Sequence, residues 1–103
     1  MSPETIERHL IMLALFYATR DKRMMAEGLY RQVLDTLEYD KKTAKLNYNL
    51  VMALNFYGRM LMANPKRQKE AQGYIKQSEQ IVQGMPYWYD KLDNIFLPSF
   101  DLE

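Results

Sequence analysis

The stretch "MAEGLYRQVLDTLE", residues 25–38, carries a clear helical signal. Its apolar stripe, spaced by four, three and four positions, consists of Ala26, Tyr30, Val33 and Leu37. This spacing places a small residue, an aromatic residue and two aliphatic residues on one face of an α-helix. Such a face is stable only when another element covers it, so the neighbouring segments decide the architecture.

A second amphipathic pattern precedes this stretch and predicts a helix over 3–19. Its inward stripe consists of Ile6, Leu10, Leu13 and Tyr17. Ser2 as N-cap and Pro3 at the first helical position favour a start at this point. The segment "TRDKR", residues 19–23, interrupts the apolar spacing. Two helices joined by a short turn form a hairpin, predicted here over residues 3–40.

A second hairpin is predicted over residues 41–84. After the break at "YDKK", Asp40 is an N-cap for a long helix that ends near Ala63. Its inward stripe consists of Leu46, Leu50, Ala53, Tyr57, Met60 and Leu61. Asn64 and Pro65 predict the start of a fourth helix that stops at Gly84. The residues expected to face inward on that helix are Ala71, Tyr74, Ile75, Ser78 and Val82.

Composition excludes several classes of function. Fourteen basic and thirteen acidic residues leave a net charge of +1, so no overall field favours nucleic acid. The longest apolar run, residues 10–18, is nine residues long, against about 20 for a membrane-spanning helix. Cysteine is absent, which excludes disulfides and thiol chemistry. We therefore expect neither nucleic-acid binding nor membrane insertion.

Residues that carry chemistry are few. His9 is the only histidine, so a second imidazole for a metal site is missing, and we interpret His9 as a solvated surface residue. Asp35, Glu38 and Asp40 cluster near the end of the second helix, where capping and solubility explain them. The glycines are isolated and form no phosphate-binding loop. The sequence predicts a non-enzyme without cofactor or metal.

The order of side chains in the two hairpins resembles the tetratricopeptide repeat. In the first hairpin the matching positions are Leu10, Leu13, Ala14 and Tyr17, followed by Ala26, Tyr30 and Val33. Leu10 replaces the usual tryptophan, Val33 the usual alanine and Glu38 the terminal proline. The second hairpin repeats the order with Tyr57, Gly58 and Leu61, followed by Ala71, Ile75 and Ser78. Small residues allow close helix crossing, and large neighbours fill the groove.

The resemblance implies an all-α fold in which antiparallel helical hairpins stack as a short tetratricopeptide-like α-solenoid. Ala26 and Ala71 are 45 residues apart, so the helices exceed those of the usual repeat of about 34 residues. A four-helix bundle whose core meets the same pattern is the alternative. Since two repeats rarely bury their own faces, the aromatic segment 85–103 is expected to cap the second hairpin, rather than to bind a partner.

A narrower resemblance concerns the strings "LALFYATRDKRMMAEGLYRQVLDTLE" and "ALNFYGRMLMANPKRQKEAQGYIKQSEQI". They are similar to successive repeats of the tetratricopeptide repeat protein nineteen family, mitochondrial proteins linked to the assembly of respiratory complex III. This resemblance implies an assembly factor in mitochondria. A cytoplasmic adaptor is the alternative.

Two surfaces are candidates for binding another protein. In stacked hairpins the first helix of each repeat lines a concave groove, which here predicts a site for a peptide or helix. Its expected lining is Arg8, Ile11, Leu15, Met52, Asn55, Arg59 and Met62. A basic rim at the starts of the second and fourth helices suits an acidic partner, or is a solvated charged edge. The rim consists of Lys22, Arg23, Lys66, Arg67 and Lys69.

The sequence therefore predicts a non-catalytic interaction module, an adaptor or assembly factor. The alternative is a structural subunit of a larger assembly that uses apolar faces for permanent contacts. Pairing with a second copy stays open in both cases, because an uncovered apolar face promotes self-association.

Overall fold

Helices make up nearly all of the chain that the structure describes. This computed structural model describes residues 3–36 and 44–83, and the side chains within 6–36 and 48–83. The helices are α1 (Pro3–Thr19), α2 (Arg23–Thr36), α3 (Ala44–Met62) and α4 (Gln68–Gln83). Within the described ranges no strand occurs, which confirms the all-α class. Leu37, the Asp40 cap, the Leu46 side chain, the Gly84 stop and the segment 85–103 lie outside the described residues.

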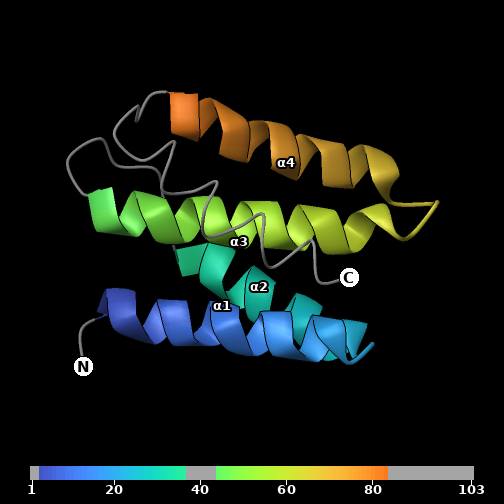
Figure 1. The fold of residues 1–103 in the computed structure, drawn as a ribbon, viewed down its shortest axis with the longest axis horizontal. Helices are drawn as coiled ribbons and strands as arrows, with labels where there is room; N and C mark the ends of the chain where they lie inside the picture. The colour runs from blue at the N-terminus through green and yellow to red at the C-terminus, as the bar shows by residue number, and fades with distance from the viewer. Residues whose placement is uncertain (1–2, 37–43, 84–103) are drawn as a thin grey trace.

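The helices form two packed pairs, α1 with α2 and α3 with α4, and in each pair the second helix runs back along the first (Figure 1). The short turns of both pairs lie at the same end of the molecule (Figure 1). Helix α3 occupies the centre, since it contacts α4 on one side and both α1 and α2 on the other. The two pairs confirm the predicted hairpins, and α3 joins them into one core.

The turn between α1 and α2 follows a Schellman arrangement. The Lys22 amide donates to the Tyr17 carbonyl at 2.9 Å, and the Asp21 amide donates to the Ala18 carbonyl at 3.2 Å. This geometry requires a left-handed backbone at Asp21, whose φ is 62°. Glycine is the usual residue at such a position because a Cβ there is sterically unfavourable. Asp21 therefore holds a strained backbone conformation in an exposed turn.

Replacing Asp21 with glycine should stabilise the protein relative to an alanine substitution. Both variants lose the exposed ion pair between Asp21 and Arg23, at 3.3 Å, so this loss cancels in the comparison. Only glycine removes the left-handed strain, and we expect Asp21→Gly to unfold with a free energy about 1 kcal/mol higher than Asp21→Ala. Urea denaturation of the two variants measures the difference. Equal midpoints would mean that Asp21 does not hold a left-handed conformation in solution.

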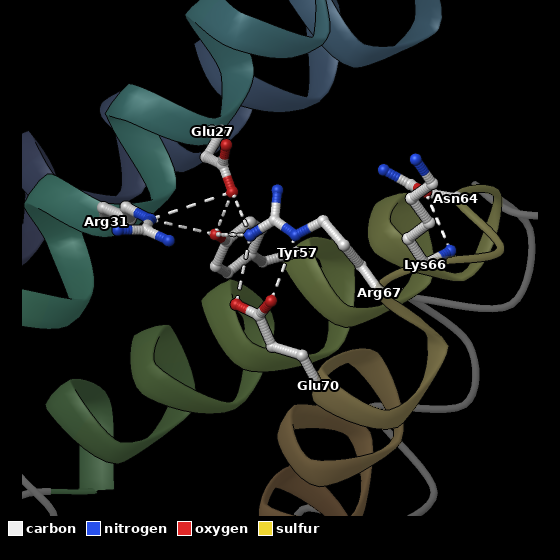
Figure 2. A network of polar contacts seen from close by, with 7 residues as sticks. All are labelled: Glu27, Arg31, Tyr57, Asn64, Lys66, Arg67 and Glu70. Atoms are coloured by element: carbon white, nitrogen blue, oxygen red, sulfur yellow. Dashed lines mark hydrogen bonds and ion pairs between the residues drawn. The ribbon is translucent and has the colours of Figure 1, made fainter.

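The turn between α3 and α4 corrects one sequence prediction. Asn64 and Pro65 do not open α4, which begins three residues later than Pro65, at Gln68. The Asn64 side-chain oxygen instead accepts the Lys66 amide at 3.0 Å (Figure 2). The Asn64 carbonyl accepts the Arg67 amide, also at 3.0 Å. Asparagine followed by proline is as favourable at the start of a β-turn as at a helix cap. The Asn64–Pro65 pair is therefore compatible with a helix start or a turn, and here it forms the turn.

The apolar stripes predicted for α2, α3 and α4 form the core. Buried stripe residues are Ala26, Tyr30, Val33, Leu50, Ala53, Tyr57, Leu61, Ala71 and Ser78. Met60, Tyr74, Ile75 and Val82 are half-buried at its edge. Three tyrosines run through this core as an aromatic column: the Tyr30 and Tyr57 rings stack with centroids 5.6 Å apart, and the Tyr57 and Tyr74 centroids lie 5.0 Å apart. This column connects α2, α3 and α4, and such ring pairs stabilise beyond their buried area.

Helix α1 is rotated relative to the prediction. Ile6 and Leu13, expected to face inward, are exposed by 46 % and 41 %, whereas Ile11 and Ala14 are fully buried. Leu10 and Tyr17 are half-buried. Because residues 10–18 are apolar on every side of the helix, periodicity does not determine which side faces the core. Contacts with both α2 and α3 select the side that contains Ile11.

Helices α3 and α4 approach each other closely at Gly58. A Cβ built on this residue would lie 2.7 Å from Cγ1 of Ile75 and 3.0 Å from the backbone oxygen of Ala71. These distances are shorter than normal van der Waals contacts, so the crossing needs a residue without a side chain. By contrast, a Cβ at Gly28 or Gly73 would meet nothing within 4 Å. Among the glycines within the described residues, only Gly58 is required by packing.

Candidate functional site

A polar network lies where the two hairpins meet (Figure 2). Glu27 of α2 and Arg67, which directly precedes α4, form an ion pair with a separation of 2.6 Å between Oε2 and Nη2. Tyr57 of α3 lies between them: its hydroxyl donates to Glu27 Oε2 and accepts from Arg67 Nη2 at 3.3 Å. Side chains from both hairpins therefore converge on one carboxylate.

Two further side chains complete the network. Glu70, three residues after Arg67, accepts hydrogen bonds from Arg67 Nε at 3.0 Å and from Arg67 Nη2 at 3.1 Å. This is the bidentate geometry that suits a guanidinium and a carboxylate. Arg31 donates to the Tyr57 hydroxyl at 3.0 Å and lies 3.7 Å from Glu27, one helical turn away. Each carboxylate is thus paired with at least one guanidinium of the same chain.

The network fixes the protonation states of its members. The hydrogen bond from Arg67 lowers the pKa of Glu27 below 4.5, against the opposing effect of burial. The same guanidinium lowers the pKa of Glu70, and the two carboxylates raise the pKa of Arg67. Burial, followed by the bond to Glu27, raises the pKa of Tyr57 above 10. At neutral pH the carboxylates are therefore negatively charged and paired with positively charged guanidinium groups. This arrangement holds the hairpins together.

The predicted basic rim separates into two kinds of residue. Lys22, Lys66 and Lys69 are exposed. Arg23 is also exposed and lies 3.3 Å from Asp21. Arg67 differs from all of them because its guanidinium is directed into the network and its side chain is only 26 % exposed. The prediction that Arg67 offers charge to a partner is therefore corrected: Arg67 is a structural residue.

The predicted groove does not form an open surface of the expected composition. Ile11, Met52 and Asn55 are buried, Leu15 and Met62 are half-buried, and only Arg8 and Arg59 of this set are exposed. The reason lies in α3, where every residue from 48 to 58 is buried. A helix that is apolar around its whole circumference is a central core helix, so its Met52 side is covered like the others.

The two exposed arginines of the predicted groove are anchored on buried amides of α3. Arg8 Nε donates to Asn49 Oδ1 at 3.3 Å, and the Arg8 guanidinium lies 5.0 Å from the centroid of the Tyr48 ring. Arg59 Nε donates to Asn55 Oδ1 at 3.1 Å, while the Asn55 amide donates to Ser78 at 3.4 Å. These contacts satisfy buried polar groups, so both arginines contribute to the fold.

A different surface is open: the outer face of α1, defined here by Ile6, Met12, Leu13 and Phe16. Each of these side chains is exposed by 41 % to 49 %. His9, predicted to be a surface residue, is indeed exposed and lies on the same side of the helix. Arg20 also lies on this side, with its guanidinium 4.8 Å from the centroid of the Phe16 ring. The neighbouring first turn of α2 adds Met24, exposed by 90 %, and Met25.

Sequence reasoning missed this face because it assigned Ile6 and Leu13 to the core. A signal was present nevertheless, since an apolar run around all sides of a helix leaves apolar residues outside when only one side is covered. Helix α1 packs against α2 and α3, which cover the side that contains Ile11 and leave the side of Ile6 and Leu13 exposed. The outer face of α1 is therefore the best candidate for a functional surface among the described residues.

Comparison of the chain with protein-family models, with curated proteins and with solved structures finds no match. Over the described ranges, no three histidine or acidic side chains are grouped as a metal ion requires. No helix in these ranges has both the length and the apolar character that a membrane crossing requires. The described residues thus present an apolar helix face on an all-α protein built from two packed helix pairs.

Proposed function

We propose that this chain is a non-catalytic protein–protein interaction module of the tetratricopeptide type, and that the outer face of α1 is its binding surface. The exposure of Ile6, Met12, Leu13 and Phe16 on one side of one helix carries this proposal. The largest apolar patch on a typical monomer covers about 300–600 Å² and is often functional. Arg20 adds a residue type that is frequent at the energetic centres of interfaces, and Phe16 adds one that is enriched in interfaces generally.

Support for the tetratricopeptide type comes from the packing of the hairpins. Ala26 is fully buried between large neighbours, and Gly58 permits a close crossing of α3 against Ala71. These are the small positions at which the sequence resembles the repeat. Stacking of further hairpins into a solenoid stays part of the proposal, as does a role in respiratory-complex assembly within mitochondria, which rests on the resemblance of the sequence.

Loss of Leu13 should abolish protein binding without unfolding the domain. Leu13→Glu places a carboxylate at the centre of the apolar face, and we expect it to lower partner binding at least about 10-fold because a buried unpaired charge is costly. The matched control is Gln72→Glu, which changes the charge equally at an exposed position on α4. The measurement is affinity capture from an extract of the source cells, using wild type and both variants as immobilised bait.

The proposal holds if wild type and Gln72→Glu retain the same proteins and Leu13→Glu loses them while its melting temperature stays within a few degrees of wild type. Equal capture by all three baits would move the binding surface away from α1. If no protein binds, including free copies of the chain itself, the chain is not an interaction module.

A structural subunit of a larger assembly is the second candidate, favoured by the same exposed apolar side chains. The two functions differ in whether a captured partner can exchange between the bound chain and free copies of the chain. An adaptor releases its captured partner when excess soluble chain competes, whereas a permanent subunit does not within hours, because obligate interfaces are larger and more apolar. Competition with unlabelled chain after capture separates the two.

A further inference from the structure

We propose that the outer face of α1 pairs with the same face of a second copy, through antiparallel packing of two α1 helices about a two-fold axis near residues 12 and 13. This inference rests on the proposed function and names the partner of that surface. Two-fold symmetric pairing is the commonest way in which a single patch covers itself, since each copy presents the patch to the other.

The size of the face fits such an interface. About half of each of its four large side chains is exposed. An aromatic side chain has about 150–250 Å² of surface, and with about 200 Å² taken for each of the four side chains this corresponds to roughly 400 Å² of apolar surface. A standard interface buries about 800 Å² per partner, of which somewhat more than half is apolar. The outer face of α1 therefore supplies most of the apolar area that a stable dimer requires.

Repulsion between the two copies of Arg20 favours one direction of pairing. His9 and Arg20 are its exposed basic residues, and no acidic residue among those with described side chains lies between them on this side. Parallel helices would bring each of these residues against its own copy. With the axis near residues 12 and 13, antiparallel helices separate the two Arg20 positions by roughly 22 Å at 1.5 Å per residue. This exceeds the Debye length of about 8 Å at physiological ionic strength.

The antiparallel register also gives each large side chain a partner. Leu13 lies beside the axis, where it meets Leu13 and Met12 of the second copy. His9 lies as far from the axis as Phe16 of the other copy does. Ile6 lies about 4.5 Å farther out at 1.5 Å per residue, level with Thr19 of the other copy. The ring of Phe16 is then covered on one side by Arg20 of its own chain. The pairing thus removes from water the side chains that define the face.

The first experiment is light scattering coupled to size-exclusion chromatography across a range of concentrations. The measured mass of wild type and of Gln72→Glu should rise with concentration from 12.3 kDa toward twice this value. Leu13→Glu should stay at the monomer mass, with a dissociation constant raised at least about 100-fold, and with an unchanged melting temperature in dilute solution. A monomeric wild type at every concentration overturns the inference, as does a Leu13→Glu variant that dimerises like wild type.

The direction of pairing is tested by cross-linking, which the absence of cysteine makes straightforward. Single-cysteine variants Leu13→Cys, Arg20→Cys and Gln72→Cys are treated with a short bismaleimide. Leu13→Cys should give a covalent dimer, and the other two should not. Efficient cross-linking of Arg20→Cys would contradict the antiparallel arrangement, and cross-linking of Gln72→Cys alone would place the contact on α4.

These results separate the inference from the function on which it rests. A chain that stays monomeric but captures a different protein through Leu13 overturns self-pairing and leaves the interaction module intact. A chain that pairs through Leu13 supports both.

Discussion

Gly58→Ala is expected to unfold with a free energy about 1–3 kcal/mol lower than Gly73→Ala. Both substitutions add one Cβ to a helix interior and gain the same intrinsic helix propensity, about 1 kcal/mol. The difference between them therefore isolates the steric cost at the crossing of α3 and α4. At Gly58 the new Cβ would lie 2.7 Å from Ile75 Cγ1 and 3.0 Å from the Ala71 oxygen, whereas at Gly73 it meets nothing within 4 Å.

Chemical denaturation of both variants provides the measurement, with Gly28→Ala as a second unobstructed control. The Ile75 contact can be tested separately, because Ile75→Ala should recover part of the loss in the Gly58→Ala background. Residues in contact show such coupling in double-mutant cycles. If Gly58→Ala and Gly73→Ala were equally stable, α3 and α4 would not cross as closely as the structure places them.

Arg67→Met should destabilise the protein by about 1–2 kcal/mol, the value of charge-assisted hydrogen bonds reduced for partial solvent access. The substitution leaves Glu27, which is 25 % exposed, without its main partner, and frees Glu70 as well. The matched control is Arg23→Met, from the same predicted basic rim. Its ion pair with Asp21 is exposed on both sides, so its loss should change stability by less than about 0.5 kcal/mol.

The pH dependence of stability gives an independent check on the network. Because the folded pKa of Glu27 lies below its ordinary value of 4.5, the unfolded chain binds this proton first as the pH falls. The stabilisation is therefore complete above pH 4.5 and is lost as the pH falls through the folded pKa. Glu70 acts in the same direction. In thermal unfolding, the melting temperature of wild type should fall more steeply below pH 4.5 than that of Arg67→Met.

If the melting temperatures of wild type and Arg67→Met fell equally below pH 4.5, the Glu27–Arg67 pair would not form in solution. A large loss of stability in Arg23→Met would instead show that charge at this end of the molecule stabilises without specific geometry. The two variants therefore distinguish a fixed network from a general electrostatic effect.

The fold could be predicted in large part from local patterns. The stripes of α2 and α4 were recognisable because these helices have a polar side, and the stripe of α3 because it places a small residue between large ones. The same reasoning failed on α1, because an apolar run from residue 10 to 18 has no polar side to mark solvent. Consequently Ile11 was expected in a groove and is buried, and Leu13 was expected in the core and is exposed.

The polar network around Arg67 was less predictable than the fold. Lys22, Arg23 and Arg67 are equivalent in sequence, each being a basic residue before or at the start of a helix. Glu27 and Tyr57 distinguish them, and these lie 40 and 10 positions from Arg67 along the chain. Pairing over such separations depends on how the hairpins are placed against each other, which composition and spacing leave open.

By itself, the sequence determined the all-α class, the two hairpins and most of the inward stripes, because backbone hydrogen bonding and side-chain periodicity within a helix are local properties. The tertiary structure decided which side of α1 is buried, that α3 lies at the centre, and that Arg67 binds Glu27 instead of facing solvent. These features depend on the rotation and separation of whole helices. Packing fixes both, since close-packed cores allow only arrangements in which distant side chains fit together.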